Sequence, residues 1–131
     1  MTILVAYVPR PEGQVALEKG IEIALRRDED LVVVNASPGG SKEDSSLSDV
    51  VDYERVKEAL AASGVRGDLK QLVRGKTAVQ EIQELVETLR ASLLIIGLRK
   101  RSPIGKLIMG SVAQEILLTV TCPILAVKSS T

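Results

Sequence analysis

The stretch "LLIIGLRKRSPIGKLIMGS" (residues 93–111) decides the fold, because it joins an apolar run to a basic, glycine-containing segment and then to a helical pattern. The run "LLIIG" is continuously apolar, which is typical of a parallel strand that helices cover on both faces. After Ser111, apolar residues recur at helical spacing until Pro123. The stretch therefore predicts a strand, a loop that begins at Gly97, and a helix.

The same alternation of strand and helix patterns extends along the whole chain. Apolar runs predict strands, and a less apolar run predicts an edge strand; they lie at 3–8, 31–35, 93–97 and 123–128, with the edge strand at 68–74. Between them, apolar residues at helical spacing predict four helices, around residues 17–25, 53–60, 82–89 and 113–120. Such alternation predicts an α/β fold with a parallel sheet and helices on both faces.

Three local signals refine this picture. Thr77 and Gln80 have the spacing of a capping box at the start of the third helix, and Gly64 follows the second helix as a C′ residue. The polar insertion at 37–48 predicts a solvated loop, or a lid over the carboxyl ends of the strands. We expect one domain over residues 1–131.

Composition excludes several classes of function. The net charge is zero and aromatic residues make up only 2% of the chain, which disfavours a nucleic-acid-binding surface. The chain has no His and one Cys, Cys122, so the commonest general base, the commonest metal ligand and an internal disulfide are missing. No run approaches the roughly 18 apolar residues of a membrane span. These features predict a cytoplasmic protein that is not an enzyme and holds no metal of its own.

The segment after Gly97 does not match the common phosphate-binding motifs. Gly105-Lys106 has the end of a Walker A loop, but Lys100 stands where its first glycine belongs and Leu107 where its Ser or Thr belongs. The dinucleotide fingerprint G-x-G-x-x-G would follow the first strand, where only Gly13 is present.

Gly97 and Gly110 are thirteen positions apart, and Ser111 follows. With this spacing, a Pro-Glu turn after the first strand, and "CPILAVK" at the last strand, the chain resembles the universal stress protein family. The resemblance implies the adenine nucleotide alpha hydrolase-like fold, a flavodoxin-like three-layer sandwich with a five-stranded parallel sheet in the order 3-2-1-4-5. In that order a ligand binds where the order reverses, between strands one and four.

The resemblance also implies a nucleotide site for ATP, with Mg²⁺, or for AMP. The residues placed there are Ala6, Tyr7, Val8, Asn35, Gly97, Arg99, Lys100, Gly110, Ser111 and Val112. The free N–H groups at the start of the last helix favour a phosphate, and Arg99 and Lys100 are placed to close over it. Alternatively, Ser111 and Gln114 form a capping box, and the basic cluster is a solvated loop.

Two positions depart from the family pattern. Nucleotide-binding members have an Asp where this chain has Val8, and the second glycine of their loop is Lys100 here. Losing an acceptor to a charged group costs about 1.5–3 kcal/mol, roughly ten- to a hundred-fold in affinity. Lys100 adds a cation but loses the conformational freedom of glycine.

The sequence therefore leaves three functions open. The first is a regulatory module of the stress response that binds an adenine nucleotide or phosphate. The second is a dimeric protein that binds no nucleotide and acts through protein partners, and the third is an enzyme of the wider adenine-nucleotide alpha-hydrolase-like group. The last strand is apolar up to Lys128, so as a sheet edge it favours pairing with a second copy. The resemblance implies the same homodimer, through Pro123, Ile124, Leu125, Ala126 and Val127.

Overall fold

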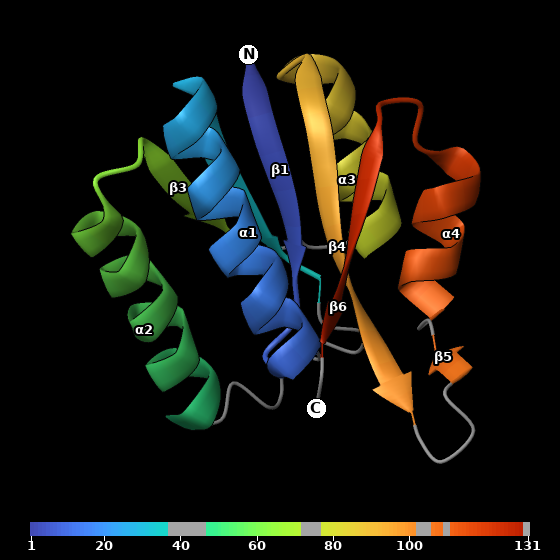
Figure 1. Cartoon of the computed structure of the whole chain (residues 1–131), viewed down its shortest axis with the longest axis horizontal. Coiled ribbons are helices and arrows are strands. Elements are labelled where there is room, and N and C mark those ends of the chain that lie inside the picture. The colour runs from blue at the N-terminus through green and yellow to red at the C-terminus, as the bar shows by residue number, and fades with distance from the viewer. Residues whose placement is uncertain (37–46, 72–76, 102–105, 109–110, 130–131) are drawn as a thin grey trace.

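The computed structural model describes residues 1–36, 47–71, 77–101, 106–108 and 111–129, with residues 47–51, 100–101, 106–108 and 111–112 described by their backbone (Figure 1). The strands are β1 (Thr2–Tyr7), β2 (Asp30–Asn35), β3 (Gly67–Lys70), β4 (Ala91–Arg101), β5 (Lys106–Ile108) and β6 (Ile124–Ser129). The helices are α1 (Pro11–Arg27), α2 (Leu47–Ser63), α3 (Ala78–Thr88) and α4 (Ser111–Thr119).

Five strands form a parallel sheet in the order β3-β2-β1-β4-β6, which confirms the predicted order, with β6 as the fifth strand of the prediction. β1 lies at the centre, with β2 on one side and β4 on the other. The sequence steps from β1 outward through β2 to β3 and then returns past β1 to β4. The order of the strands therefore reverses between β1 and β4.

Two apolar cores lie on opposite faces of this sheet. Side chains alternate along a strand, so Ile3, Val5 and Tyr7 pack toward α1 and α2, whereas Leu4 and Ala6 pack toward α3 and α4. Figure 1 shows α1 and α2 in front of the sheet and α3 behind it. Because both faces are covered, the central strands are buried and apolar at consecutive positions, at residues 3–6, 31–34 and 94–96. Each fully buried Val, Leu or Ile contributes about 1.5–3 kcal/mol.

The helix boundaries follow the local signals in the sequence. In α3, the Gln80 backbone N–H donates to the Thr77 hydroxyl over 3.1 Å, and the Thr77 N–H donates to the Gln80 side chain over 2.9 Å, which confirms the capping box. Gly64 follows α2 with a φ of +80°, as expected for a C′ glycine. α4 begins at Ser111 itself, which differs from a capping box with Ser111 ahead of the first helical residue.

The prediction that β4 ends at Gly97 is wrong, because the strand continues to Arg101. Its extension has two partners: β6 runs parallel to it as far as Arg99, and β5 pairs with it antiparallel, Lys100 opposite Leu107. Pairing with β6 as far as Arg99, and with β5 from Arg99 to Arg101, keeps the basic segment extended. No pattern in the amino-acid sequence predicted these pairings. β3 covers only part of the predicted strand at 68–74, of which residues 72–74 lie outside the described residues, as does most of the predicted loop at 37–48.

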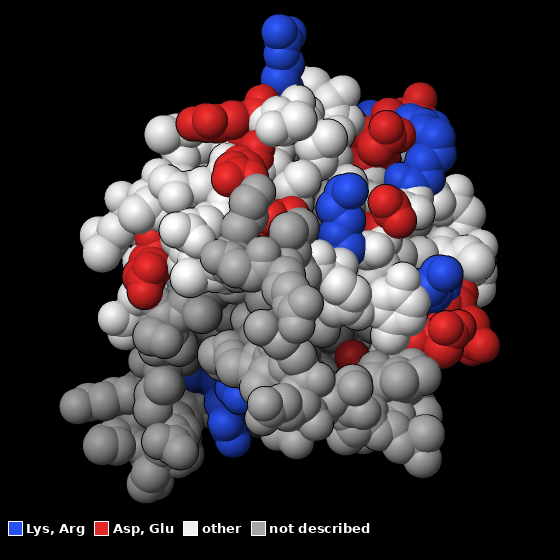
Figure 2. All heavy atoms as spheres, turned by 180° about the vertical axis from the view of Figure 1, so that it is seen from behind, with Lys and Arg blue, Asp and Glu red and all other residues white. Residues whose placement is uncertain are grey.

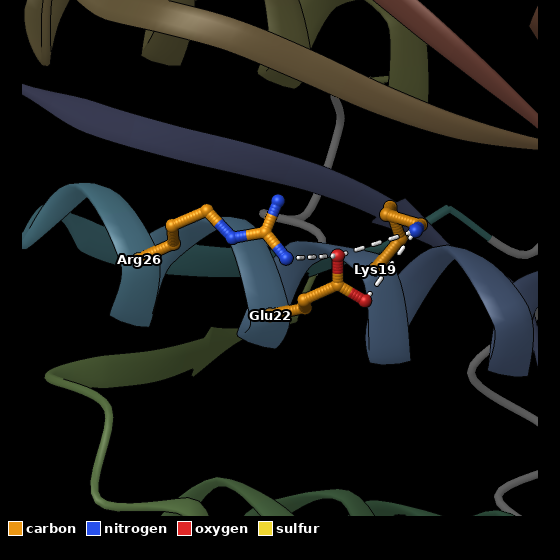
Figure 3. Close-up of polar contacts among 3 residues, drawn as sticks. All are labelled: Lys19, Glu22 and Arg26. Atoms are coloured by element: carbon orange, nitrogen blue, oxygen red, sulfur yellow. Dashed lines mark hydrogen bonds and ion pairs between the residues drawn. The ribbon is translucent and has the colours of Figure 1, made fainter.

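The surface carries charges of both signs in small groups. On the outer side of α1, Glu22 accepts from Lys19 over 3.3 Å and from Arg26 over 3.2 Å (Figure 3). Figure 2 shows acidic and basic side chains interspersed on the side opposite the view of Figure 1. Exposed pairs of this kind each contribute at most about 1 kcal/mol. The interspersed charges agree with the zero net charge of the chain.

Candidate functional site

The candidate site lies where the strand order reverses, at the carboxyl ends of β1 and β4. α1 leaves β1 on one face of the sheet, and α4 follows β4 and β5 and packs on the other face through Ile116. In open α/β sheets, ligands bind in the crevice outside the carboxyl ends of the strands at such a reversal. α1 therefore begins just after the carboxyl end of β1, and α4 begins after β5, which pairs with the carboxyl end of β4.

The junction between β1 and α1 is a tight turn. The Arg10 N–H donates to the Val8 carbonyl over 2.8 Å, and the Gln14 N–H donates to the Arg10 carbonyl over 3.0 Å as the helix begins. Pro11 occupies the first helical position, where its missing N–H costs nothing. A Cβ on Gly13 would overlap the Val8 carbonyl, so this turn requires glycine at position 13.

Gly97 of the neighbouring strand β4 packs against this junction. It lies inside β4, paired with Val127 of β6, and a Cβ at this position would overlap the backbone carbonyl of Glu12. The absence of a side chain allows the first turn of α1 to rest directly on β4. The sequence did not predict this packing role of Gly97, because its spacing from Gly110 indicated a phosphate-binding loop. Its role in nucleotide binding stays a prediction.

Glu12 lies in this contact and is only 8% exposed. Its Oε1 atom is buried, and no hydrogen-bond donor reaches it within the described part of the chain. Acidic residues are favoured in the first turn of a helix by the helix dipole, so the sequence offered no reason to single out Glu12. Its burial follows from the close approach of α1 to β4.

The hydroxyl of Tyr7 is directed toward α2. It donates to the carboxylate of Asp52, with distances of 3.0 Å to Oδ1 and 3.1 Å to Oδ2, and Arg55 donates to Asp52 over 2.6 Å and to the Tyr7 oxygen over 3.4 Å. Burial, followed by the hydrogen bond and charge of Asp52, raises the pKa of Tyr7 to about 12, and Arg55 opposes this shift. The hydroxyl thus anchors α2 to the end of β1.

The predicted nucleotide-binding residues divide between the two faces of the sheet. Ala6 is buried and Val8 half-buried on the α3 and α4 face. Tyr7 lies on the α1 and α2 face, as does Asn35, which pairs with Tyr7 in the sheet and donates to the Gln71 side chain over 3.3 Å. The side chains of Ala6 and Val8 therefore lie on one face of the sheet, and those of Tyr7 and Asn35 lie on the opposite face.

The basic stretch divides in a similar way. Leu98 packs toward α3 and α4, so the exposed Arg99 lies on the opposite side of β4, toward α1. Lys100 follows in the strand, and Ser111 and Val112 form the start of α4. Gly110 lies outside the described residues. The prediction that these residues hold a phosphate stays a prediction.

Among the described residues, no group of three His, Cys, Asp or Glu side chains has the arrangement of a metal site. The described helices include none with the length and apolar character needed to span a membrane. Cys122 is half-buried, and burial raises the pKa of its thiol.

Comparison with known proteins gives the family. The profile of the universal stress protein family matches residues 1–128. A universal stress protein of Mycolicibacterium smegmatis is 42% identical over 126 residues, which cover 96% of each chain.

Solved structures agree with this assignment. The structure of a universal stress protein from Archaeoglobus fulgidus has a TM-score of 0.74 at 28% identity, with 97% of each chain covered. A universal stress protein from the same organism, solved in complex with dAMP, has a TM-score of 0.69 at 21% identity, covering 97% of this chain and 96% of that one. From the profile match and the 42% identical relative, this chain belongs to the universal stress protein family.

Proposed function

We propose that this universal stress protein is a regulatory module that binds an adenine nucleotide, ATP or AMP, or another phosphate anion, with at most slow hydrolysis. The observation that carries the proposal is that α4 begins at Ser111, shortly after β5, which pairs with the carboxyl end of β4, one of the two strands between which the strand order reverses. A relative of the same fold was solved with dAMP, which supports an adenine nucleotide as the ligand.

The phosphate end of the proposed site is the N-terminus of α4. The first N–H groups of a helix have no partner within the helix, and together with the helix dipole they favour an anion. We assign the backbone of Gly110, Ser111 and Val112 and the charge of Lys100 to this end. Arg99 lies toward α1, so we assign it a place at the rim, where it attracts the anion without direct contact.

The adenosine end is formed by Ala6 and Val8, which offer apolar surface where the resemblance implied an Asp. Without that acceptor we expect affinity in the micromolar range rather than tighter. Asn35 and the Gly97 backbone complete the proposed site; if ATP is the ligand, Mg²⁺ accompanies its phosphates.

The second candidate is a homodimer that binds no nucleotide. Its support is the outer edge of β6, because no strand pairs with that edge within the described ranges. Pairing of Pro123–Val127 with a second copy would continue the sheet. Light scattering of Ala126→Lys against the unchanged protein tests the interface: we expect the dimer to weaken, and an unchanged dimer would exclude β6 as its interface.

Calorimetric titration with Mg-ATP and with AMP tests nucleotide binding, together with acid release of any co-purified nucleotide. We expect binding in the unchanged protein and none in the double variant Gly110→Val with Ser111→Ala. Thr119→Ala is the matched control, since its hydroxyl donates to the Glu115 carbonyl at the other end of α4 over 2.7 Å. No binding in the unchanged protein would favour the second candidate, and unchanged affinity in the double variant would exclude the α4 N-terminus.

A further inference from the structure

α2 packs on the sheet through fewer buried residues than α1 or α3. Of its described side chains, at positions 52–63, those of Val56 and Leu60 are buried, with 1% and 4% exposed. α1 buries six residues, and the shorter α3 buries five. Most of the free energy that holds a helix on a sheet comes from burial of its apolar face, so α2 is the most weakly held of these three helices.

The strand under α2 is also less buried than the centre of the sheet. α2 lies over β3 at one margin of the sheet (Figure 1), and Leu60 packs over Gly67, since a Cβ on that glycine would lie 3.0 Å from the Leu60 Cδ2 atom. None of the four residues of β3 is buried, whereas all six residues of β1 are. Few buried apolar contacts are typical of a unit that opens at a lower free energy than the whole protein.

A polar contact joins α2 to the central strand. Asp52 precedes Val56 by four positions and Leu60 by eight, so the three side chains share the face of α2 that lies toward the sheet. The Tyr7 hydroxyl donates to the Asp52 carboxylate over 3.0 Å. Arg55 also donates to Asp52, but both belong to α2 and stay together if the helix moves. The Tyr7 hydrogen bond therefore connects α2 to the body of the protein.

The carboxyl end of α2 has the features of a hinge. Gly64 follows the helix with a φ of +80°, and a Cβ there would meet no atom within 4 Å, so the backbone has room to turn. Two residues later, Arg66 is fixed to β2: its carbonyl accepts from the Leu31 N–H over 2.9 Å, and its side chain donates to Asp30 over 2.7 Å. Gly64 thus separates the helix from a fixed point of the chain.

We propose that α2 is a hinged element that separates from the sheet about Gly64 while the rest of the fold stays intact, and that the Tyr7–Asp52 hydrogen bond is its latch. The latch lies at the last residue of β1, one of the two strands between which the strand order reverses. A change at that strand end that breaks the hydrogen bond therefore releases α2. This inference goes beyond the proposed function and does not depend on whether a nucleotide binds.

Thiol labelling at a buried position of α2 tests the opening. Cys122→Ser first removes the one native cysteine, and Val56→Cys is then compared with the control Ile82→Cys, in the middle of α3 and 0% exposed. Urea unfolding of each variant gives the labelling rate that global unfolding alone allows. We expect labelling at position 56 to exceed that rate at least about ten-fold, and labelling at position 82 to match it, although Ile82→Cys removes the larger side chain.

Two outcomes overturn the opening of α2. The first is labelling at position 56 at the rate of global unfolding, which would mean that α2 stays on the sheet until the whole protein unfolds. The second is an equal excess at positions 56 and 82, which would mean that the opening is not a property of α2.

Tyr7→Phe, added to the Val56→Cys chain, tests the latch. Loss of the donor to Asp52 should speed labelling at position 56 about ten- to a hundred-fold, and the rate should stay above that of global unfolding in the same chain. Tyr53→Phe on α2 is the matched control, for which we expect a rate within about two-fold. A rate after Tyr7→Phe that is equally unchanged, or that only equals the rate of global unfolding, would overturn the latch.

Discussion

The two connections that leave the reversal of strand order are built differently. The β1–α1 junction is a tight turn, in which Gly13 and Gly97 allow backbone to touch backbone. The β4–α4 connection extends β4 beyond Gly97 and returns through β5 before α4 begins. The first connection depends on close packing, whereas the second depends on strand pairing at the periphery of the sheet. The comparison teaches that glycine spacing alone does not assign a role: Gly97 belongs to the close packing of α1 on β4, although its spacing from Gly110 in the sequence suggested a phosphate loop.

Gly97→Ala disrupts the packing of α1 on β4 and has the largest expected effect on stability. The added Cβ meets the Glu12 backbone carbonyl, which cannot turn away as a side chain would, so we expect a loss of about 3 kcal/mol in the free energy of unfolding. Urea unfolding measures it.

Gly64→Ala is the control for the loss of a glycine as such. A Cβ at Gly64 meets no atom within 4 Å, and only its φ of +80° opposes the change, at about 1 kcal/mol. Equal losses in the two variants would contradict the packing role of Gly97.

Tyr7→Phe tests the polar anchor at the end of β1. The change removes the donor to Asp52 and leaves Asp52 paired with Arg55, so we expect a loss of about 2 kcal/mol. Tyr53→Phe is the matched control on α2, where the ring lies under the Lys57 ammonium at 5.5 Å; there we expect a change below about 0.5 kcal/mol. Similar values for the two variants would show that the anchor contributes nothing.

The pH dependence of stability follows from the same hydroxyl. The pKa of Tyr7 is about 12 in the folded protein and about 10 in the unfolded chain. Between these values the unfolded chain loses a proton that the folded protein keeps, so stability is complete below pH 10 and falls as the pH rises toward 12. Urea unfolding at pH 9 to 11.5 measures this slope, and Tyr7→Phe should have a smaller one. Equal slopes would contradict the assignment to Tyr7.

Arg99→Ala addresses the extended connection and has the smallest expected effect on stability. Its side chain is exposed, and only its backbone joins β6 and β5, so we expect a change within about 0.5 kcal/mol. If the nucleotide proposal holds, Lys100→Ala should weaken AMP binding more than Arg99→Ala does. A larger effect from Arg99 would place the phosphate on the α1 side of β4.

The sequence by itself determined the order of strands and helices, the start of α3 at its capping box and the end of α2 at Gly64. Continuous apolar runs, helical spacing, the Thr77 capping box and Gly64 are local signals, and each has a local physical cause. With the family resemblance, these signals were enough to predict the sheet order and the position of the reversal.

Only the tertiary structure decided what the residues at that reversal do. The extension of β4, the contact of Gly97 with α1, the Tyr7–Asp52 hydrogen bond and the burial of Glu12 each join segments that are far apart in the chain. Periodicity and capping report how a residue relates to its near neighbours in sequence. They carry no information about which strand or helix packs against a residue from a distant part of the chain. That packing determines whether a glycine forms a turn or allows a close contact, and whether a carboxylate is solvated or buried.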